Sequence, residues 1–366
     1  MKFSCATSDF ARAAGIAERF CGKNIALPVL AQVLIEADGD IVSVTGTNLE
    51  HAVVWRVPAR VSRNGKVCVP ARTLSSLLQS FGDQEVRVEE ENGSLRLAVK
   101  ERDGKVNGMP ADEFPLVPTV KKMQSFTVNA GVFSQNLARI LPAVSASEFK
   151  PELTGVSLRV DADTMTLAAT DTFRLGECGI TDRSLGSEEA VSCIIPERTA
   201  TEMMRILDGQ TGKVTVSLGE NQLLVECDDG KIISRLIDGN FPDYRAIIPA
   251  QFSTSAYVKK NDLIAAIRSA SIFASKLQEV TLRFSPTGLE IAASNPDVGE
   301  YRTTCQAALT GKEISMSFNW RYIMDGIQAL DDEEIFFGCN KESSPALMRN
   351  KSHQAYTYVV MPIRLT

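Results

Sequence analysis

The sequence predicts an α+β protein of three similar tandem domains, each with two helices packed on antiparallel sheet. The first observation is a motif that occurs three times, at 44–49, 167–175 and 291–296. In each copy an apolar run ends in small residues, followed by a hydroxyl side chain beside Asn or Asp. That Asn or Asp lies at positions 48, 171 and 295, which are 123 and 124 residues apart. A fixed period of this kind indicates a repeated architecture.

A second, unrelated landmark has the same period. Arg72, Arg198 and Arg321 are 126 and 123 residues apart, and each lies at the start of an expected helix. A Pro or an Asn lies two positions before each arginine, and these residues are favoured at helix N-termini. Apolar residues then follow at helical spacing. The two landmarks therefore support the same three repeats.

The other elements are expected in the same order within each repeat. An earlier helix opens each repeat, at about 8–20, 131–144 and 260–273. Gly82 and Gly209 stand where two of the later helices should end. Short alternating runs rich in β-branched residues are typical of antiparallel hairpins, and they lie at 85–88, 94–99, 213–218 and 222–226. The predicted domains are 1–121, 122–250 and 251–366, with connections near 116–125 and 246–256.

Composition limits the class of protein. The 366 residues are 44% hydrophobic and 23% charged, which is ordinary for globular domains with large cores. We expect a cytoplasmic protein, because the N-terminus lacks the features of a signal peptide and no stretch has the roughly 18 apolar residues of a membrane span. The eight cysteines stand singly and only two histidines are present. We therefore expect reduced, mostly buried thiols, no metal site and no cofactor.

Arginines occupy the outer face of every expected helix. On a helical wheel they lie away from the apolar residues that would face the core. One such helix would be explained by an ordinary solvated face, but all six share the pattern in a chain of net charge −6. The helices would then form the positive surface of an acidic protein. Side chains that contact only phosphate bind nucleic acid without reading its sequence.

No enzymatic motif competes with this interpretation. The sequence lacks a phosphate-binding loop, a nucleophile elbow, a zinc-protease motif and a paired-carboxylate signature. Asp171 and Asp243 could act as general acids or bases, but turn residues are favoured because Asp closes local hydrogen bonds. His51 is expected to be an outward strand residue, since strand-like alternation follows it. The acidic run 331–334 is expected to be an exposed loop after a helix rather than a metal site.

Three stretches resemble one known family, the β subunit of bacterial DNA polymerase III, which is the sliding clamp. They are Ala169-Thr170-Asp171 followed by Arg174-Leu175, the run 236–245 that contains Phe-Pro-Asp-Tyr-Arg, and the C-terminal run 358–365. The resemblance extends over the whole chain. It implies three domains per subunit and two subunits joined head to tail in a closed ring, with helices lining the hole and sheets outside.

The resemblance implies a non-catalytic processivity factor for DNA replication. Such a homodimer encircles duplex DNA independently of sequence and tethers the polymerase by topology. The implied partners are the DNA polymerase III catalytic subunit, the clamp loader and other proteins with a clamp-binding motif. Alternatives are a diverged second clamp that serves another polymerase or competes with the main clamp, an enzyme on the same scaffold, and a monomeric interaction module. The residues expected to face DNA are Arg12, Arg19, Lys23, Arg72, Arg139, Lys150, Arg198, Arg205, Arg268 and Arg321.

The family also binds partner peptides in a pocket between its second and third domains. In this sequence the pocket would consist of Leu153, Thr170, Thr172, Phe173, Arg174, Leu175, Pro242, Ile247, Val360, Met361, Pro362, Ile363 and Arg364. The stretch 172–175 has no counterpart in the other two repeats, which favours partner binding over a scaffold role.

Two positions depart from the family's pocket pattern. Thr172-Phe173 stands where the family usually has Gly-His, and Ala246 where it usually has a second Arg. These departures allow a different preferred partner motif, because a Gly gives backbone freedom and an Arg gives a donor fork. The dimer contact would involve Val106 of one subunit and Ile272 and Phe273 of the other.

Overall fold

The computed structural model describes residues 1–22, 27–182, 185, 190–353 and 355–364. The chain divides into two compact units. Unit 1 comprises Met1–Val132 and Arg205–Leu236, and unit 2 comprises Phe133–Met204 and Ile237–Thr366.

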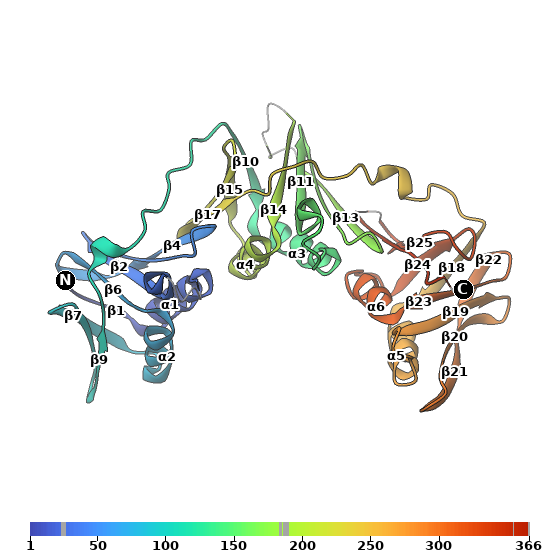
Figure 1. Cartoon of the computed structure of the whole chain (residues 1–366), viewed down its shortest axis with the longest axis horizontal. Helices are drawn as coiled ribbons and strands as arrows, with labels where there is room; N and C mark the ends of the chain where they lie inside the picture. The colour runs from blue at the N-terminus through green and yellow to red at the C-terminus, as the bar shows by residue number, and fades with distance from the viewer. Residues whose placement is uncertain (23–26, 183–184, 186–189, 354, 365–366) are drawn as a thin grey trace. The chain divides into compact units, whose positions relative to one another are not determined.

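One succession of elements occurs three times along the chain (Figure 1): a strand, a helix, a group of strands, a second helix and three final strands. The first repeat contains β1 (Lys2–Ala6), α1 (Thr7–Phe20), β2 (Gln32–Asp38), β3 (Ile41–Thr47), β4 (His51–Pro58), β5 (Arg60–Arg63), β6 (Gly65–Pro70), α2 (Ala71–Phe81), β7 (Glu85–Glu91), β8 (Ser94–Val99) and β9 (Arg102–Asn107). The second contains β10 (Gln124–Asn129), α3 (Ala130–Ile140), β11 (Gly155–Asp161), β12 (Thr164–Thr170), β13 (Arg174–Thr181), β14 (Val191–Pro196), α4 (Glu197–Leu207), β15 (Lys213–Leu218), β16 (Gln222–Cys227) and β17 (Gly230–Arg235). The third contains β18 (Thr254–Lys259), α5 (Lys260–Ser271), β19 (Glu279–Ser285), β20 (Gly288–Asn295), β21 (Gly299–Cys305), β22 (Ala307–Gly311), β23 (Ile314–Asn319), α6 (Trp320–Gln328), β24 (Glu334–Cys339), β25 (Ala346–Asn350) and β26 (Tyr356–Val360).

Capping residues in the sequence set the start of α6 and the end of α2. Asn319 caps α6 by accepting a hydrogen bond from the backbone N–H of Arg321 at 3.0 Å, because the first N–H groups of a helix have no partner within it. Gly82 ends α2 with a φ of 72°, a conformation that glycine adopts without a steric penalty. Leu74 and Leu78 of α2 are buried while Arg72 is exposed. The predicted helices and hairpins are confirmed.

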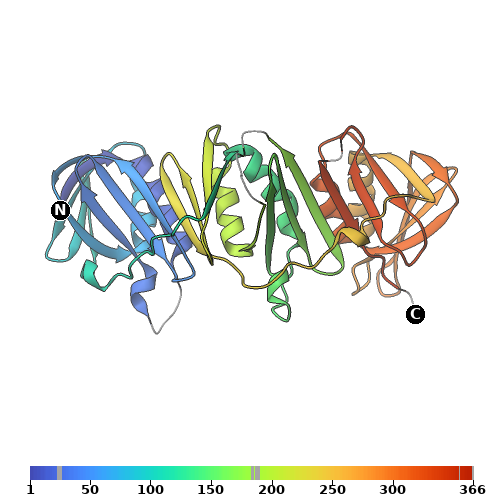
Figure 2. The same cartoon turned by 90° about the horizontal axis from the view of Figure 1, so that it is seen from above.

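The described residues form four sheets, each by antiparallel pairing. Unit 1 holds a five-stranded sheet, β5-β1-β7-β8-β9, and an eight-stranded sheet, β10-β15-β16-β17-β4-β3-β2-β6. Unit 2 holds a nine-stranded sheet, β14-β11-β12-β13-β26-β25-β24-β18-β22, and a four-stranded sheet, β21-β20-β19-β23. Figure 2 shows the strands of neighbouring repeats running on as continuous sheets.

Two of these pairings join one repeat to the next. In unit 1 β4 pairs with β17, which places Val53 opposite Ile232. In unit 2 β13 pairs with β26, which places Leu175 opposite Val359. In both cases the last strand of one repeat pairs with a strand of the repeat before it. The two receiving strands, β4 and β13, occupy the same place in their repeats. Backbone hydrogen bonds therefore hold each junction together.

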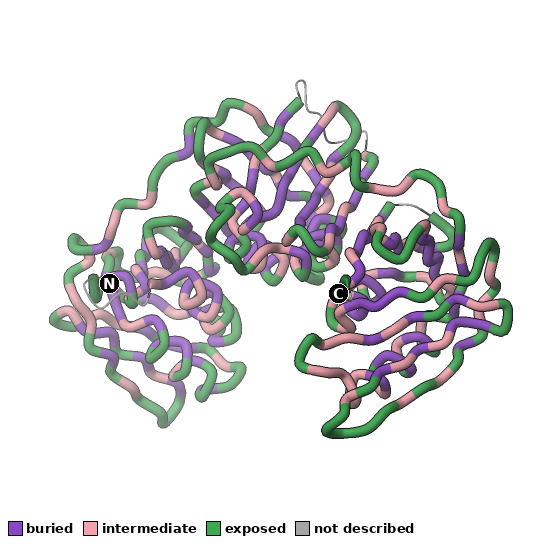
Figure 3. Tube along the Cα trace, turned by 45° about the vertical axis from the view of Figure 1, so that its right-hand side comes forward, coloured by how far each residue is buried: buried purple, intermediate pink, exposed green. Residues whose placement is uncertain are grey.

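The buried residues, purple in Figure 3, lie inside the units, and most of them are apolar. Phe10 and Phe20 of α1 are fully buried in unit 1, and Tyr356 and Tyr358 of β26 are almost fully buried in unit 2. All eight cysteines are free and six are buried, which confirms the expectation of mostly buried thiols. Among the described helices, none is long and apolar enough to cross a membrane.

The expectation for His51 is wrong. Its side chain is 4% exposed, and its ring lies 4.5 Å from the ring of Phe20, centroid to centroid. Strand alternation placed it on the outer face, but α1 packs against β3 and β4 and covers this position. His51 is thus a core residue at the start of β4.

Gly326 of α6 marks a close approach between that helix and β26. A Cβ atom there would lie 2.4 Å from Cδ1 of Tyr358 and 2.6 Å from Cε of Met348. We expect Gly326→Ala to lower the free energy of unfolding of unit 2 by about 1–3 kcal/mol, because both neighbours are packed in the core. Guanidinium unfolding followed by circular dichroism measures this. Gly179→Ala is the matched control, since nothing lies within 4 Å of its added Cβ; equal midpoints for both variants would contradict the packing argument.

Candidate functional site

A hydrogen-bonded turn shapes the predicted partner-binding loop between β12 and β13. Thr170 Oγ1 donates to the carbonyl of Arg174 at 2.7 Å and accepts from the N–H of Thr172 at 3.2 Å. Asp171 Oδ1 accepts from the N–H groups of Phe173 and Arg174, each at 2.9 Å. Thr172 has a φ of 76°. Asp171 is therefore a turn residue, as predicted, and Asp243 likewise accepts from the N–H of Arg245 at 3.2 Å.

The first repeat contains the same turn. Thr47 Oγ1 donates to the carbonyl of His51 at 2.9 Å and accepts from the N–H of Leu49, whose φ is also 76°. Asn48 Oδ1 accepts from the N–H groups of Glu50 and His51 at 3.0 and 2.9 Å. The expectation that 172–175 has no counterpart is thus wrong for the backbone. It holds for the side chains, because Phe173 and Arg174 replace Glu50 and His51.

The C-terminal segment meets this loop in unit 2. The N–H of Met361 donates to the carbonyl of Phe173 at 2.8 Å, and the N–H of Ile363 donates to the carbonyl of Ser317 at 2.7 Å. A buried apolar cluster lies beneath, with part of the 236–253 connection packed on it. The cluster consists of Leu175, Phe336, Leu347 and Val359, with Tyr244, Ile248 and Phe252 against it.

The predicted pocket residues differ in exposure. Phe173 is 59% exposed and Ile247 50% exposed, so two large apolar side chains face solvent beside the cluster. Thr172, Pro242 and Arg364 are exposed, Arg174, Met361 and Ile363 are half-buried, and Leu153, Thr170, Leu175, Val360 and Pro362 are buried. Burial, together with a hydrogen bond to Glu177, raises the pKa of Tyr244. The connection is thus anchored at Tyr244 while neighbouring apolar side chains remain open to solvent.

Arg174 is held by groups from two repeats. Its Nε donates to Asp171 Oδ2 at 2.9 Å, and its Nη1 pairs with Asp325 of α6. The guanidinium carbon lies 4.2 Å from the ring centroid of Tyr322, also on α6, and the side chain is 13% exposed. The resemblance assigned Arg174 to the pocket. The structure shows that its charge is neutralised within the protein, and that Asp325 and Tyr322 position it.

In unit 1 three of the predicted DNA-facing arginines come together. Arg12 and Arg19 of α1 and Arg205 of α4 line one hollow of about 580 Å³. Arg12 is 54% exposed, and its Nη1 lies 3.7 Å from Asp229 Oδ2. Arg72 is exposed on α2. Lys23 lies outside the described residues.

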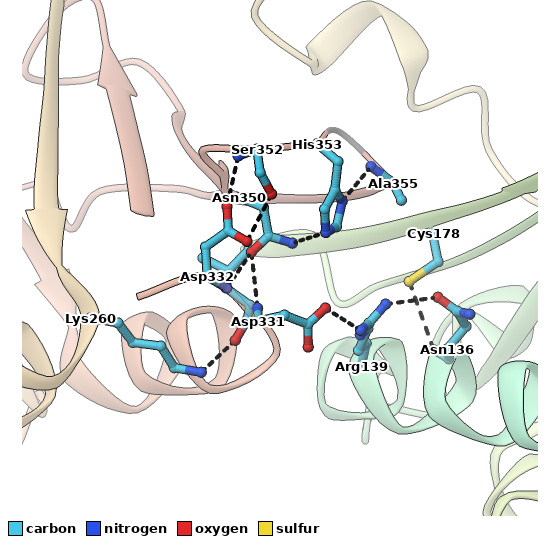
Figure 4. Close-up of polar contacts among 11 residues, drawn as sticks. Asn136, Arg139, Cys178, Lys260, Asp331, Asp332, Asn350, Ser352, His353 and Ala355 are labelled. Carbon is cyan, nitrogen blue, oxygen red and sulfur yellow. Dashed lines mark hydrogen bonds and ion pairs between the residues drawn. The ribbon is translucent and has the colours of Figure 1, made fainter. Parts of the chain in front are cut away.

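In unit 2 Lys150, Arg198, Arg268 and Arg321 are exposed. Arg139 differs, because its side chain is 18% exposed and its guanidinium pairs with Asp331 and donates to Asn136 Oδ1 at 3.3 Å (Figure 4). The wheel placed Arg139 opposite the apolar face of α3. It could not reveal that the loop after α6 covers this position.

Asp331, Asp332 and Glu333 of the acidic run lie in the loop after α6, and Glu334 begins β24. Figure 4 shows the contacts of Asp331 and Asp332. Asn350 Oδ1 accepts from the N–H groups of Asp331 and Asp332 at 2.9 and 3.1 Å. Ser352 donates to Asp332 from its N–H at 2.7 Å and its hydroxyl at 2.9 Å, and these bonds lower the pKa of Asp332. Among the described residues, no group of three or more His, Cys, Asp or Glu side chains is arranged to hold a metal ion.

The predicted dimer residues lie near two unpaired sheet edges. Val106 belongs to β9, an edge strand of the five-stranded sheet, and is itself buried. Ile272 follows α5 and is 69% exposed. The ring of Phe273 stacks on that of Tyr301 in β21, with the two ring centroids 6.0 Å apart. β21 is an edge strand of the four-stranded sheet.

Comparisons with known proteins match the entire length of the chain. Three family models match in order: the N-terminal domain of the DNA polymerase III β subunit over residues 1–118, its central domain over 127–243 and its C-terminal domain over 245–364. A β sliding clamp from Synechococcus elongatus is 27% identical over 100% of both chains. One from Pseudomonas aeruginosa is 29% identical over 96% of this chain and 95% of the relative.

Solved structures agree in fold. A sliding clamp from Pseudomonas aeruginosa with a ligand has a TM-score of 0.93 at 27% identity, with full coverage of both chains. A sliding clamp from the same organism bound to griselimycin has a TM-score of 0.94 at 26% identity, again with full coverage. The DNA polymerase III β subunit of Thermotoga maritima has a TM-score of 0.94 at 25% identity, also with full coverage.

The contact between Arg174 and Asp325 leads to a prediction about stability. Asp325→Asn removes the charge that joins α6 to the 170–175 loop and leaves Asp171 as the remaining carboxylate partner of Arg174. We expect a loss of about 1–3 kcal/mol in the free energy of unfolding of unit 2, since hydrogen bonds to charged groups contribute this much. Glu313→Gln is the control: its partner is Arg283 and both side chains are more than half exposed, so we expect a change within about 1 kcal/mol. Equal effects in chemical denaturation would show that the Arg174 contacts add nothing beyond a surface ion pair.

Proposed function

The chain belongs to the family of the DNA polymerase III β subunit, and from this we propose that it acts as a DNA sliding clamp. Members of the family are non-catalytic processivity subunits. The observation that carries the proposal is the match of all three domain models in order along one chain, together with the threefold succession of elements. The protein would encircle duplex DNA in the cytoplasm and tether a polymerase to it.

We place the domain boundaries at 1–121, 122–250 and 251–366. Each range contains one complete succession of two helices and their strands. The β4–β17 and β13–β26 pairings cross the two boundaries. Neighbouring domains would therefore be joined by sheet as well as by their connecting segments.

The same pairing rule supports a closed homodimer. At both internal junctions, the last strand of one repeat pairs with the third strand after the first helix of the repeat before it. That strand is β4 in the first repeat and β13 in the second. The corresponding strands left unpaired are β9 of the first repeat and β21 of the third, and each is a sheet edge. Joining β9 of one subunit to β21 of another would repeat the junction between chains, with Val106, Ile272 and Phe273 nearby. Two such contacts would close a head-to-tail ring.

The exposed arginines supply the DNA contact. The exposed Arg12 and Arg205 and the half-buried Arg19 share one hollow on the helical surface of unit 1. Other exposed cations lie on α2, α4, α5, α6 and the 145–150 loop. None of them reads a base in this proposal. Contact with phosphates alone is weak, depends on salt and permits sliding. Arg139 would contribute less, because Asp331 neutralises it.

The loop at 170–175, the 242–247 segment and the C-terminal segment form the proposed pocket for partners. Its wall is apolar and Phe173 and Ile247 are open to solvent, as extended peptide recognition requires. The proposed occupants are clamp-binding peptides of the polymerase catalytic subunit, the clamp loader and other partner proteins.

A topological test decides the ring. The protein is loaded with a clamp loader onto nicked circular DNA, the circle is cut in half of the sample, and retained protein is measured by gel filtration. We expect retention on circles and loss from linear DNA, because a ring slides off free ends. Light scattering should give twice the 39.8 kDa mass of one chain. Equal retention on both DNAs, or a monomer at micromolar concentration, would contradict the ring.

A second experiment tests the arginines that are proposed to contact DNA. Replacing Arg72, Arg198 and Arg321 by Ser should reduce the slope of log affinity against log salt by about 2–3, since each lost phosphate contact lowers it by about one. The matched control replaces Arg56, Arg235 and Arg283, which are exposed arginines on strands. We expect its slope to equal that of the parent protein.

The pocket is tested with a labelled clamp-binding peptide. Phe173→Ser and Met361→Ala together should weaken binding by about tenfold to thirtyfold, the usual effect of truncating apolar anchors. Leu277→Ser is the control, because Leu277 is 64% exposed in unit 2 and lies outside the pocket residues. Unchanged peptide affinity in the double variant would place the partner site elsewhere.

A further inference from the structure

The five-stranded sheet of unit 1 has one face against α1 and one face in solvent. Phe3 and Val88 point inward, and the ring centroid of Phe3 lies 5.7 Å from that of Phe10 on α1. Because side chains alternate along a strand, Lys2, Ser4 and Arg87 point to the opposite face. This solvent face lies on the other side of the sheet from the α1 arginines.

A hollow of about 530 Å³ lies on this solvent face, and we call it the sheet-face hollow. The strand register explains its shape. Ser4 lies opposite Arg60 on one side and Arg87 on the other, and Arg87 lies opposite Ala98. The small side chains of Ser4 and Ala98 leave space between longer neighbours. The charged residues that line the hollow are Lys2, Arg60, Arg87, Glu89 and Arg96.

The surface around the hollow already binds carboxylates of the same chain. Glu89 lies 3.1 Å from Lys2 Nζ and 3.5 Å from Arg63 Nη2, and the hydrogen bond from Lys2 lowers the pKa of Glu89. Arg96 donates from its Nε to both carboxylate oxygens of Asp103, at 3.1 and 2.9 Å. These contacts show that the cations on this face bind carboxylate groups.

Two cations of the hollow are left without close partners. The Arg87 side chain has neither a hydrogen bond nor an ion pair among the residues that the structure describes. Arg60 is 90% exposed, and the nearest carboxylate oxygen, of Glu85, is 4.0 Å away. On a chain of net charge −6, this is a local excess of positive charge. Such an excess attracts anions and steers their approach.

We propose that the sheet-face hollow binds an acidic segment of a partner protein, with Arg60 and Arg87 as the principal contacts. A guanidinium donates two parallel hydrogen bonds to one carboxylate, which favours Asp and Glu side chains as ligands. Single-stranded nucleic acid is disfavoured, because the aromatic residue at the hollow, Phe3, is 3% exposed and offers no ring for base stacking. The contact uses neither the helical arginines nor the 170–175 loop, so it adds a second protein-binding surface to the chain.

The experiment uses the full-length protein and fluorescein-labelled hexaglutamate, with anisotropy measured from low to physiological salt. The test variant is Arg60→Ser with Arg87→Ser. The control is Arg56→Ser with Arg235→Ser, which makes the same charge change at exposed strand positions of unit 1 outside the hollow. Unlabelled hexathymidylate is the competing probe. Thermal unfolding checks that both variants are folded, which is expected because all four side chains are exposed.

We expect the test variant to bind hexaglutamate at least about tenfold more weakly than the parent protein, a factor that corresponds to one lost charge-assisted contact. The control should retain the affinity of the parent. Equal weakening in both variants would mean that only net charge matters and would overturn the proposal. Tighter binding of hexathymidylate, with the same dependence on Arg60 and Arg87, would also overturn it by identifying nucleic acid as the ligand.

Discussion

Antiparallel pairing between successive repeats is the interaction on which the other features depend. The β4–β17 and β13–β26 ladders make each junction a continuation of a sheet rather than a contact between two finished surfaces. A backbone ladder fixes distance and register together, since a shift of one residue would turn every side chain to the other face. The 170–175 loop and the C-terminal segment are brought together by this ladder, because Arg174 lies opposite Val360 within it.

Side-chain contacts then fix the helices beside the ladder. Arg174 pairs with Asp325, and Arg139 pairs with Asp331, so two helices of unit 2 are joined to neighbouring segments by charge. Tyr356 adds a hydrogen bond from its hydroxyl to the carbonyl of Arg139 at 3.3 Å. The side chains of Arg174 and Arg139 are mostly buried, and a buried charge must be paired to be tolerated. The cationic helical surface is therefore smaller than the number of its arginines suggests.

The sequence was sufficient to predict the elements but insufficient to predict their contacts across repeats. Period, capping residues and strand alternation are local signals, so the helices, the hairpins and the turn role of Asp171 could be predicted. The burial of His51 and the pairing of Arg139 depend on segments far away in the chain, which a wheel or an alternation pattern does not include. The pocket residues came from resemblance to a family. Only the structure shows that Arg174 is held by Asp325.

The two junctions have the same backbone and differ in the side chains that they present. At the first, the N–H of Arg235 donates to the carbonyl of Glu50 at 2.8 Å; at the second, the N–H of Met361 donates to the carbonyl of Phe173 at the same distance. An apolar peptide docked at the first junction would have to remove water from the charged side chains of Glu50 and Arg235, which costs free energy without compensation. At the second junction it would cover the apolar side chains of Phe173 and Met361 and gain from their burial. The repeat therefore supplies two equivalent frameworks, and the proposed partner pocket lies at the second, where these two side chains are apolar.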